Sequence, residues 1–512
     1  MRCQTMTRTA TIPRTLSELK DWGHRYRTVK QELRENVLRR LVRGEEMFPG
    51  VIGYEDTVLP QLVQGILSGH DLLLLGLRGQ AKTRLLRQCV GLLDEWIPVI
   101  GAAGVDLPDD PLHPTTRAGR RAVEVEGGET PIRWLHRSQR FHEKLATPDV
   151  TIADLIGEID LVKHAEGRYL ADESTMHFGL VPRSNRGIFV INELPDLAPR
   201  IQVGLFNVLE ERDVQIRGYP IRLELDLSLM FSANPEDYTN RGRIVTPLKD
   251  RIGSVVRTHY PADIREAIRI TSGSAFLDRK GGIRHEASVV HTGDLPDGGS
   301  LHPPEPIDPP EVSMPVVMHE IIEETIRQAR TSPHINQASG VSVRASIAAL
   351  ECVISSAELR AVRTGETRTT VRPCDTVHFA AALRGKLELM LSEDSPDGTS
   401  TEDRLIHALL GEAVRAVVGR YVGIEQVEHL AAPFGSGLRL DLDDATSGAD
   451  AVASMRHVND LIPQAVQLCK RLEMDHSDEG VLSCAGELLL EFLYVNNRLS
   501  KSFGRAGARY SR

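Results

Sequence analysis

The sequence lacks the features expected of a metal-cluster protein or a protein that coats nucleic acid. Its six cysteines lie far apart and form no CxxC pair, which argues against a zinc or iron–sulfur site and favours a reducing compartment. Aromatic residues make up 4% of the chain, and no aromatic stripe suggests base stacking. Because the net charge is −10, we expect no general nucleic-acid partner.

Long apolar runs are also missing from the sequence. None reaches the roughly 18 residues that a membrane-spanning helix requires. The first residues carry Arg2, Arg8 and Arg14 without the apolar stretch of a secretory signal, so we expect a cytoplasmic protein with no membrane span. At 512 residues the chain is too long for one hydrophobic core, and two or three domains are expected.

The most informative stretch is a run of four leucines followed by a glycine-rich turn, residues 71 to 83. The leucines predict a strand buried on both faces, as in a parallel sheet. Gly76 and Gly79 allow a tight turn that aims N–H groups at phosphate oxygens. Lys82 would then bind the β- and γ-phosphates and Thr83 would coordinate magnesium, so ATP and Mg²⁺ are the expected cofactors.

This turn departs from the consensus G-x-x-x-x-G-K-[ST] at one position, where alanine replaces the second glycine. Alanine can adopt right-handed dihedrals, so we expect the loop to be intact. The alternative is a glycine-rich turn that binds nothing. The expected nucleotide-binding residues are Gly76, Gly79, Gln80, Ala81, Lys82, Thr83 and Arg84.

Four more apolar runs predict the other strands of the sheet, at 96–101, 187–193, 227–234 and 255–261. The second run ends in Asn192-Glu193, where a P-loop protein needs a carboxylate pair. Asn192 can accept a hydrogen bond from a metal-bound water but adds no charge, whereas Glu193 is a candidate base. Asn234 ends the next run and could orient the attacking water, unless Asn-Pro is a simple turn initiator.

Several longer motifs follow one another in a recognisable order. They are Gly79-Gln-Ala-Lys-Thr83, the stretch from Phe178 to Glu193, Phe206-Asn-Val-Leu-Glu-Glu211, Ser232-Ala-Asn-Pro235 and Leu248-Lys-Asp-Arg251. Over roughly residues 50 to 262 the sequence resembles an AAA+ ATPase, and more closely the magnesium chelatase subunit I and MoxR branch. This resemblance implies an α/β fold: a P-loop core with a five-stranded parallel sheet, followed by an α-helical lid and a helical C-terminal extension.

The resemblance also implies a domain plan. It places a helix-2 insertion at 151–186 and a β-hairpin before sensor 1 at 213–225, where apolar and polar residues alternate. The expected parts are exposed N-terminal helices at 1–46, the AAA+ core at 47–275, a Pro/Gly-rich linker at 276–315, the lid at 316–424 and the extension at 425–512. Residues 102–150 are expected to form an irregular surface insertion.

By the same resemblance, residue roles can be assigned. Glu193 corresponds to the Walker B base, with Asn192 in place of the usual aspartate, and Asn234 to sensor 1. Arg251 resembles the arginine finger that reaches a neighbouring subunit's ATP, and Arg344 resembles sensor 2. Ordinary salt bridges are the alternative for both arginines. The resemblance also implies a homo-oligomeric, hexameric ring and a partner with a von Willebrand factor A domain.

The expected function is an ATP-hydrolysing ring motor that remodels a protein partner or assists metal insertion or cofactor maturation. One alternative is a nucleotide-binding scaffold that hydrolyses ATP weakly, because Asn192 adds no charge. Another is the ATPase subunit of a magnesium–protoporphyrin chelatase proper. A helicase or transcription activator would share the core, but no GAFTGA-type loop and no recognisable DNA-binding module supports it.

Overall fold

The computed structural model divides the chain into two compact units, Met1–Tyr260 and Pro261–Arg512. The residues it describes are 12–159, 176–210, 213–215, 222–235, 244–277, 309–337, 339–390, 401–443, 445–504 and 507–511.

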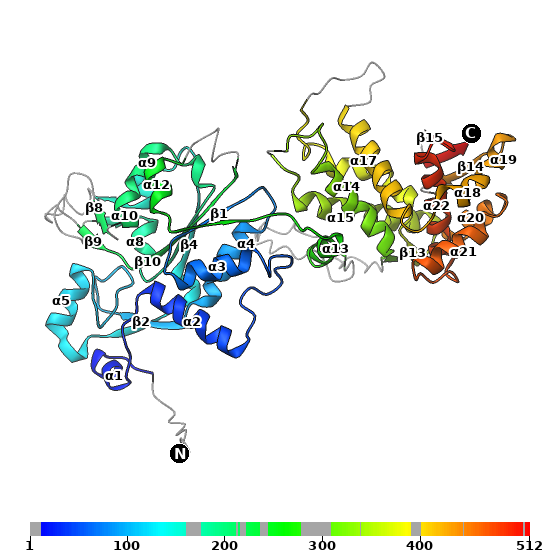
Figure 1. Ribbon diagram of the computed structural model, residues 1–512. Coiled ribbons are helices and arrows are strands. Elements are labelled where there is room, and N and C mark those ends of the chain that lie inside the picture. Colours follow the sequence, from blue (N-terminus) through cyan, green and yellow to red (C-terminus); the bar gives the residue numbers. More distant parts are fainter. Residues whose placement is uncertain are drawn as a thin grey trace, which may run out of the picture. The chain divides into compact units, whose positions relative to one another are not determined.

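The first unit is built on a five-stranded parallel sheet (Figure 1). Its strand order is β11 (Ser254–Arg257), β1 (Leu72–Leu75), β10 (Leu227–Ala233), β7 (Gly187–Asn192) and β4 (Phe141–Leu145). All four neighbouring pairs are parallel. The carboxyl ends of these strands therefore meet at one edge, and the predicted fold class is confirmed.

Both faces of this sheet are covered, so alternate residues of the three central strands, β1, β10 and β7, enter two different cores. Leu72 and Leu74 pack with helices α2 (Val29–Arg43), α3 (Val58–Leu67) and α4 (Lys82–Gln88). Leu73 and Leu75 pack on the other side, with α9 (Pro199–Gly204), α10 (Phe206–Glu210) and α12 (Thr246–Arg251). Figure 1 shows these two helical layers on opposite sides of the strands. The alternation explains why the strands read as continuous apolar runs.

Two predictions about the sheet are wrong. The run at 96–101 forms β2 (Trp96–Ile100), which pairs antiparallel with β3 (Ile132–His136) outside the main sheet. The fifth strand of the main sheet is instead β4, inside the segment expected to be an irregular insertion. That segment also contains α5 (Arg117–Glu126). The insertion therefore completes the sheet and is not a surface loop.

Helix α2 is not the exposed helix that its charges suggested. Val29, Leu33 and Val37 are at most 2% exposed and belong to the core beneath the sheet. Glu32, also 2% exposed, accepts hydrogen bonds from the Arg140 guanidinium at 2.8 and 2.6 Å. The basic composition of α2 suggested an exposed helix. These three apolar residues are spaced four apart and form one continuous helical face, so the helix packs against the sheet.

Short elements complete the first unit. They are α1 (Leu16–Asp21), α6 (Ile152–Leu155), β5 (Gly157–Ile159), β6 (Met176–Phe178), α8 (Leu180–Arg183), β8 (Asp213–Gln215) and β9 (Arg222–Glu224). Strands β8 and β9 pair antiparallel, as the predicted hairpin requires, and β5 pairs antiparallel with β6 within the predicted helix-2 insertion. The centre of that insertion, 160–175, and the hairpin turn, 216–221, lie outside the described residues.

The second unit is mainly helical, as predicted. Its helices are α13 (Ile264–Ser272), α14 (Val316–Ala329), α15 (Val343–Thr364), α16 (Phe379–Leu383), α17 (Thr401–Val418), α18 (Ile424–Val427), α19 (Ala432–Gly435), α20 (Gly448–Met455), α21 (Leu461–Arg471) and α22 (Glu479–Val495). Residues 451–472 are divided between two helices, α20 and α21. A short 3-10 turn, Pro373–His378, leads directly into α16. Most of the expected linker, 278–308, lies outside the described residues.

Five strands accompany these helices. β12 (Glu311–Ser313) pairs parallel with β13 (Arg368–Thr370), and β14 (Leu440–Asp443), β16 (Gly507–Ser511) and β15 (Ser500–Gly504) form a small antiparallel sheet. Within the described residues, no helix is both long and apolar enough to cross a membrane.

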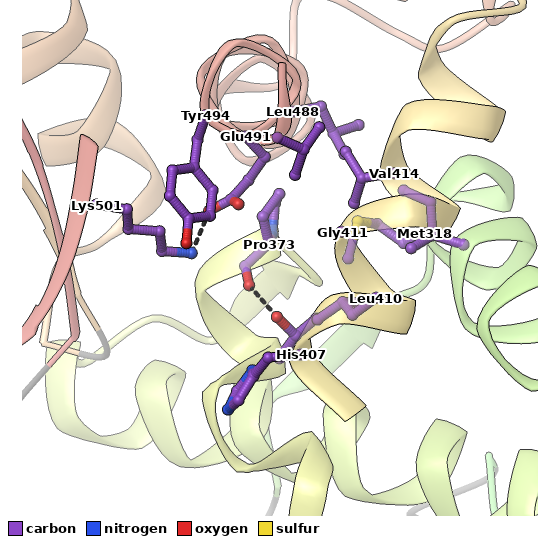
Figure 2. A pocket seen from close by; sticks show the side chains of 13 residues that line it. Met318, Pro373, His407, Leu410, Gly411, Val414, Leu488, Glu491, Tyr494 and Lys501 are labelled. Atoms are coloured by element: carbon purple, nitrogen blue, oxygen red, sulfur yellow. Dashed lines mark hydrogen bonds and ion pairs between the residues drawn. The ribbon is translucent and has the colours of Figure 1, made fainter. Parts of the chain in front are cut away.

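A pocket lies among the helices of the second unit (Figure 2). Its lining is largely apolar and comes from α14, α17, α22 and neighbouring segments. At one side Lys501 pairs with Glu491, which also accepts a hydrogen bond from the Tyr510 hydroxyl. The polar groups at this side thus satisfy one another. No residue predicted to bind nucleotide lines this pocket.

Candidate nucleotide-binding site

The turn after β1 forms a compact loop whose shape depends on glycine. A Cβ atom at Gly76 would come within 1.8 Å of the Thr258 Oγ1 atom and 2.3 Å of the Gln80 Oε1 atom. Gly79 has a φ of 75°, a conformation that favours glycine. Strand β1, this loop and helix α4 therefore follow one another as the motif predicts.

Ala81 departs from its predicted conformation. We expected right-handed dihedrals, but Ala81 has φ 54° and ψ 15°, in the left-handed region, and precedes the first residue of α4. For an L-residue with a Cβ atom this conformation costs about 1–2 kcal/mol. The loop geometry, rather than the preference of alanine, sets these angles, and the consensus glycine would adopt them without that cost.

We expect Ala81→Gly to raise the free energy of unfolding of the first unit by about 0.5–1 kcal/mol, because the relieved strain exceeds the added entropy of the unfolded chain. Tryptophan fluorescence can follow this unit selectively. The three tryptophans, Trp22, Trp96 and Trp134, all lie within it.

The matched control is Ala122→Gly, in the interior of the right-handed helix α5. There the same substitution should destabilise by about 1 kcal/mol. Equal destabilisation by both variants would contradict the left-handed assignment of Ala81.

Two residues outside the predicted motifs hold the loop in place. The Tyr54 hydroxyl shares its one proton between the backbone oxygens of Gln80, at 3.0 Å, and His259, at 2.8 Å. Burial raises the pKa of Tyr54, so its hydroxyl keeps its proton. Thr258 Oγ1 donates to Gln80 Oε1 at 2.8 Å. Gln80, which is 5% exposed, is therefore held in the interior by hydrogen bonds to its backbone and its side chain, and this fixes the position of the loop.

The predicted lysine, sensor and base residues lie together at the carboxyl ends of neighbouring strands. The Lys82 ammonium donates to Asn234 Oδ1 at 2.8 Å, to Leu77 O at 3.1 Å and also to Gly76 O. Asn234 Nδ2 donates in turn to Glu193 Oε2 at 3.0 Å. The structure thus connects the loop lysine to the candidate base through one amide.

Asn192 is 7% exposed and uses both ends of its amide. Its Oδ1 atom accepts from the Ser232 hydroxyl at 3.0 Å, and its Nδ2 atom donates to Glu143 Oε1 at 2.9 Å. Glu143 comes from β4 and also accepts two hydrogen bonds from Arg87, at 2.7 and 2.8 Å. A carboxylate that was not identified from the sequence therefore lies beside Asn192, the predicted Walker B position.

The remaining predicted residues are more dispersed. Thr83 is partly buried in the first turn of α4, and the exposed Arg84 lies over Gly50, at which a Cβ atom would approach its Nη2 atom to 2.7 Å. Arg251 donates to Pro247 O at 2.9 Å and its guanidinium lies 5.0 Å from the Phe206 ring centroid. These two contacts do not involve Lys82, and the role of Arg251 toward a neighbouring subunit stays a prediction.

Arg344 is exposed in the first turn of α15, in the second unit. Its backbone N–H is capped by Ser342 Oγ at 3.2 Å. Its assignment as sensor 2 stays a prediction.

The loop suits a phosphate chain, because the ammonium of Lys82, only 6% exposed, lies at the loop carbonyls and brings a positive charge to the loop. Within the described residues, no three His, Cys, Asp or Glu side chains group to hold a metal by themselves. A magnesium ion would here need phosphate oxygens and Thr83 as ligands, as in other P-loop sites.

Tyr54, Thr258, Ser232 and Glu143 are the site residues that sequence reasoning missed. Ser232 opens the motif Ser232-Ala-Asn-Pro235 but was assigned no role, and the other three lie outside the quoted motifs. Glu143 could have been identified only if β4 had been recognised as the neighbour of β7. In that pairing Leu145 lies opposite Asn192, which brings Glu143 close to the end of β7.

Comparisons with known proteins agree with the motifs. No family model matches the chain. It is 26% identical over 269 residues to the chloroplastic magnesium-chelatase subunit ChlI of Oryza sativa subsp. indica, a match that spans 49% of this chain and 58% of the relative. This match confirms the predicted resemblance to magnesium chelatase subunit I.

Two solved structures are more distant. A model of the complex between subunits BchI and BchD of magnesium chelatase is 23% identical, with a TM-score of 0.33, covering 44% of this chain and 65% of that one. A putative ATPase from Cytophaga hutchinsonii is 17% identical, with a TM-score of 0.29, covering 77% and 97%. TM-scores below 0.5 do not by themselves establish a shared fold.

Proposed function

We propose that this AAA+ ATPase relative, of the magnesium chelatase subunit I type, binds ATP with Mg²⁺ at the loop after β1 and hydrolyses it. The observation that carries this proposal is the connection from Lys82 through Asn234 to Glu193, with N···O distances of 2.8 and 3.0 Å. It places the lysine that follows β1 and the carboxylate that follows β7 at one edge of the sheet, with Asn234 after β10 between them. A phosphate-binding lysine and a base for the attacking water are the two groups that γ-phosphate hydrolysis uses.

Each residue of this group has a distinct task. Lys82 supplies a fixed positive charge to the phosphate oxygens, and Thr83 offers a hydroxyl ligand to the cation. Glu193 accepts a proton from the attacking water, while the Asn234 amide holds the Glu193 carboxylate and orients that water. Bound magnesium would neutralise charge that develops on the phosphate oxygens.

A second candidate function is a scaffold that binds nucleotide and hydrolyses it poorly. Asn192 favours this reading, because an amide replaces a charge that P-loop enzymes normally keep near the metal. Glu143 beside it favours hydrolysis, because it returns one carboxylate to the same neighbourhood.

Glu193→Gln separates the two functions. Glutamine keeps an oxygen that can accept from Asn234 but is not a base, so steady-state phosphate release should fall about 100-fold while ADP affinity is unchanged. Phosphate release is measured for the wild type, this variant and Glu124→Gln, an exposed control on α5. Equal and negligible rates for the wild type and Glu193→Gln would favour the scaffold.

We further propose that the chain assembles as a homo-oligomeric ring, hexameric by the resemblance, in which Arg251 completes the site of a neighbouring subunit. A fixed guanidinium suits γ-phosphate oxygens because it binds them in a bidentate fork. A protein bearing a von Willebrand factor A domain is the proposed partner, and remodelling of a protein client is the proposed output. Chelation of magnesium into a porphyrin is the narrower alternative.

A further inference from the structure

A directed chain of hydrogen bonds runs through the carboxyl edge of the sheet. Arg87 on α4 donates to Glu143 on β4, which accepts from Asn192 on β7 at 2.9 Å. Asn192 accepts from Ser232 on β10 at 3.0 Å, and Ser232 accepts from the backbone N–H of Glu193 at 3.2 Å. The chain therefore ends on the backbone of the candidate base, whose φ of 54° is itself unusual for a non-glycine residue.

The direction of this chain requires an amide at 192. An ionised Glu143 can only accept hydrogen bonds, so its partner must present a donor, and Asn192 does so through Nδ2. An aspartate at 192 would bring two carboxylates within hydrogen-bond distance, and like charges so close are unfavourable. The usual Walker B residue is therefore incompatible with Glu143 in this arrangement.

The two residues are also differently placed for holding charge. The Asn192 side chain is buried at the strand end, whereas the Glu143 side chain is 22% exposed and receives both Arg87 donors. Glu143 thus keeps its charge near the site without the full cost of burying it, because Arg87 and Asn192 both hydrogen-bond to it.

We infer that Glu143 and Asn192 are a transposed Walker B pair: the carboxylate normally found at the end of β7 has moved to β4, and one amide and one carboxylate must occupy the two positions. Glu143 is then a positioning residue that orients Asn192 and, through Ser232, the backbone of Glu193. The part of this inference that concerns magnesium–nucleotide affinity rests on the proposed function.

The test is a swap of the two side-chain types. The variants are Glu143→Gln, Asn192→Asp, the double variant carrying both, and Glu45→Gln as a control from the exposed Arg43–Glu45 pair. Thermal unfolding of the ligand-free chain, followed by tryptophan fluorescence, should show Asn192→Asp below the wild type. The double variant should return toward the wild type, because it restores one amide and one carboxylate.

A second readout separates positioning from simple structural support. ADP affinity is measured by calorimetry with Mg²⁺ and again with a chelator. The ratio of the two affinities gives the gain in ADP affinity that is due to the metal. Glu143→Gln should reduce this gain about tenfold, since it keeps an acceptor for Asn192 but removes the charge. The double variant should keep the gain within about threefold of the wild type.

The outcomes are distinct. Rescue by the double variant in both readouts supports the transposed pair. Additive losses in unfolding, or tighter metal-dependent binding by Asn192→Asp alone, overturn it. An equal metal gain in all variants overturns the positioning role. A wild type that binds no ADP overturns the proposed function, and the unfolding arm still decides whether the pair is transposed.

Discussion

Lys82→Ala should lower ATP affinity several hundredfold, measured by calorimetry on the full chain. Lys82 is buried, at 6% exposure, and its ammonium donates to Asn234 Oδ1 and to the carbonyls of Gly76 and Leu77. A phosphate chain in the loop would exchange these acceptors for charged oxygens. Loss of such a buried charge contact costs about 3–4 kcal/mol, which corresponds to this drop in affinity.

Lys20→Ala is the matched control, because it removes the same charge from the exposed last turn of α1. ATP affinity should be unaltered in that variant. Tryptophan fluorescence melting of both variants separates loss of binding from loss of the fold. Unchanged ATP affinity in a folded Lys82→Ala protein would mean that the loop after β1 does not bind phosphate.

Arg140→Met should destabilise the first unit by about 3–5 kcal/mol, because it leaves the buried Glu32 carboxylate without its charged partner. Arg140 is 1% exposed and also donates to Arg186 O at 2.7 Å. Glu32 in turn accepts from the Asp94 backbone at 2.6 Å. One ion pair therefore ties helix α2, the edge of the sheet and the segment after α4 together. Urea unfolding followed by tryptophan fluorescence measures the loss.

The double variant Arg140→Met/Glu32→Leu should lose less stability than the single one, since two apolar side chains leave no unpaired charge. Arg43→Met removes an arginine from an exposed pair at 3.5 Å and should leave the unfolding midpoint unchanged. Equal losses for Arg140→Met and Arg43→Met would show that the buried pair does not link α2 to the sheet.

Four of the five strands of the sheet could be predicted because each contains a run of apolar residues, and three of them, β1, β7 and β10, are buried along their whole length. Trp96–Ile100 has the same appearance, yet it pairs with β3, since apolar content does not specify a partner. The strand β4 was missed because Phe-His-Glu-Lys-Leu at 141–145 has three polar residues at its centre. A strand at the end of a sheet buries less of its surface and so carries a weaker signal.

The contact of Lys82, Asn234 and Glu193 followed from the sequence, because parallel strands bring their carboxyl ends to one edge. The left-handed backbone conformation of Ala81 could not be predicted, because alanine prefers the right-handed region and the loop imposes the other one. Glu143 did not follow either, because its significance depends on which strand lies next to β7.

The position of β4 also limits how this chain can be shortened. A truncation that treated 102–150 as dispensable would remove β4 and leave the backbone of β7 unpaired along one side. An uncovered row of N–H and C=O groups recruits strands from other molecules, so such a protein should aggregate. Shortened forms of the protein should therefore retain residues 102–150 in full.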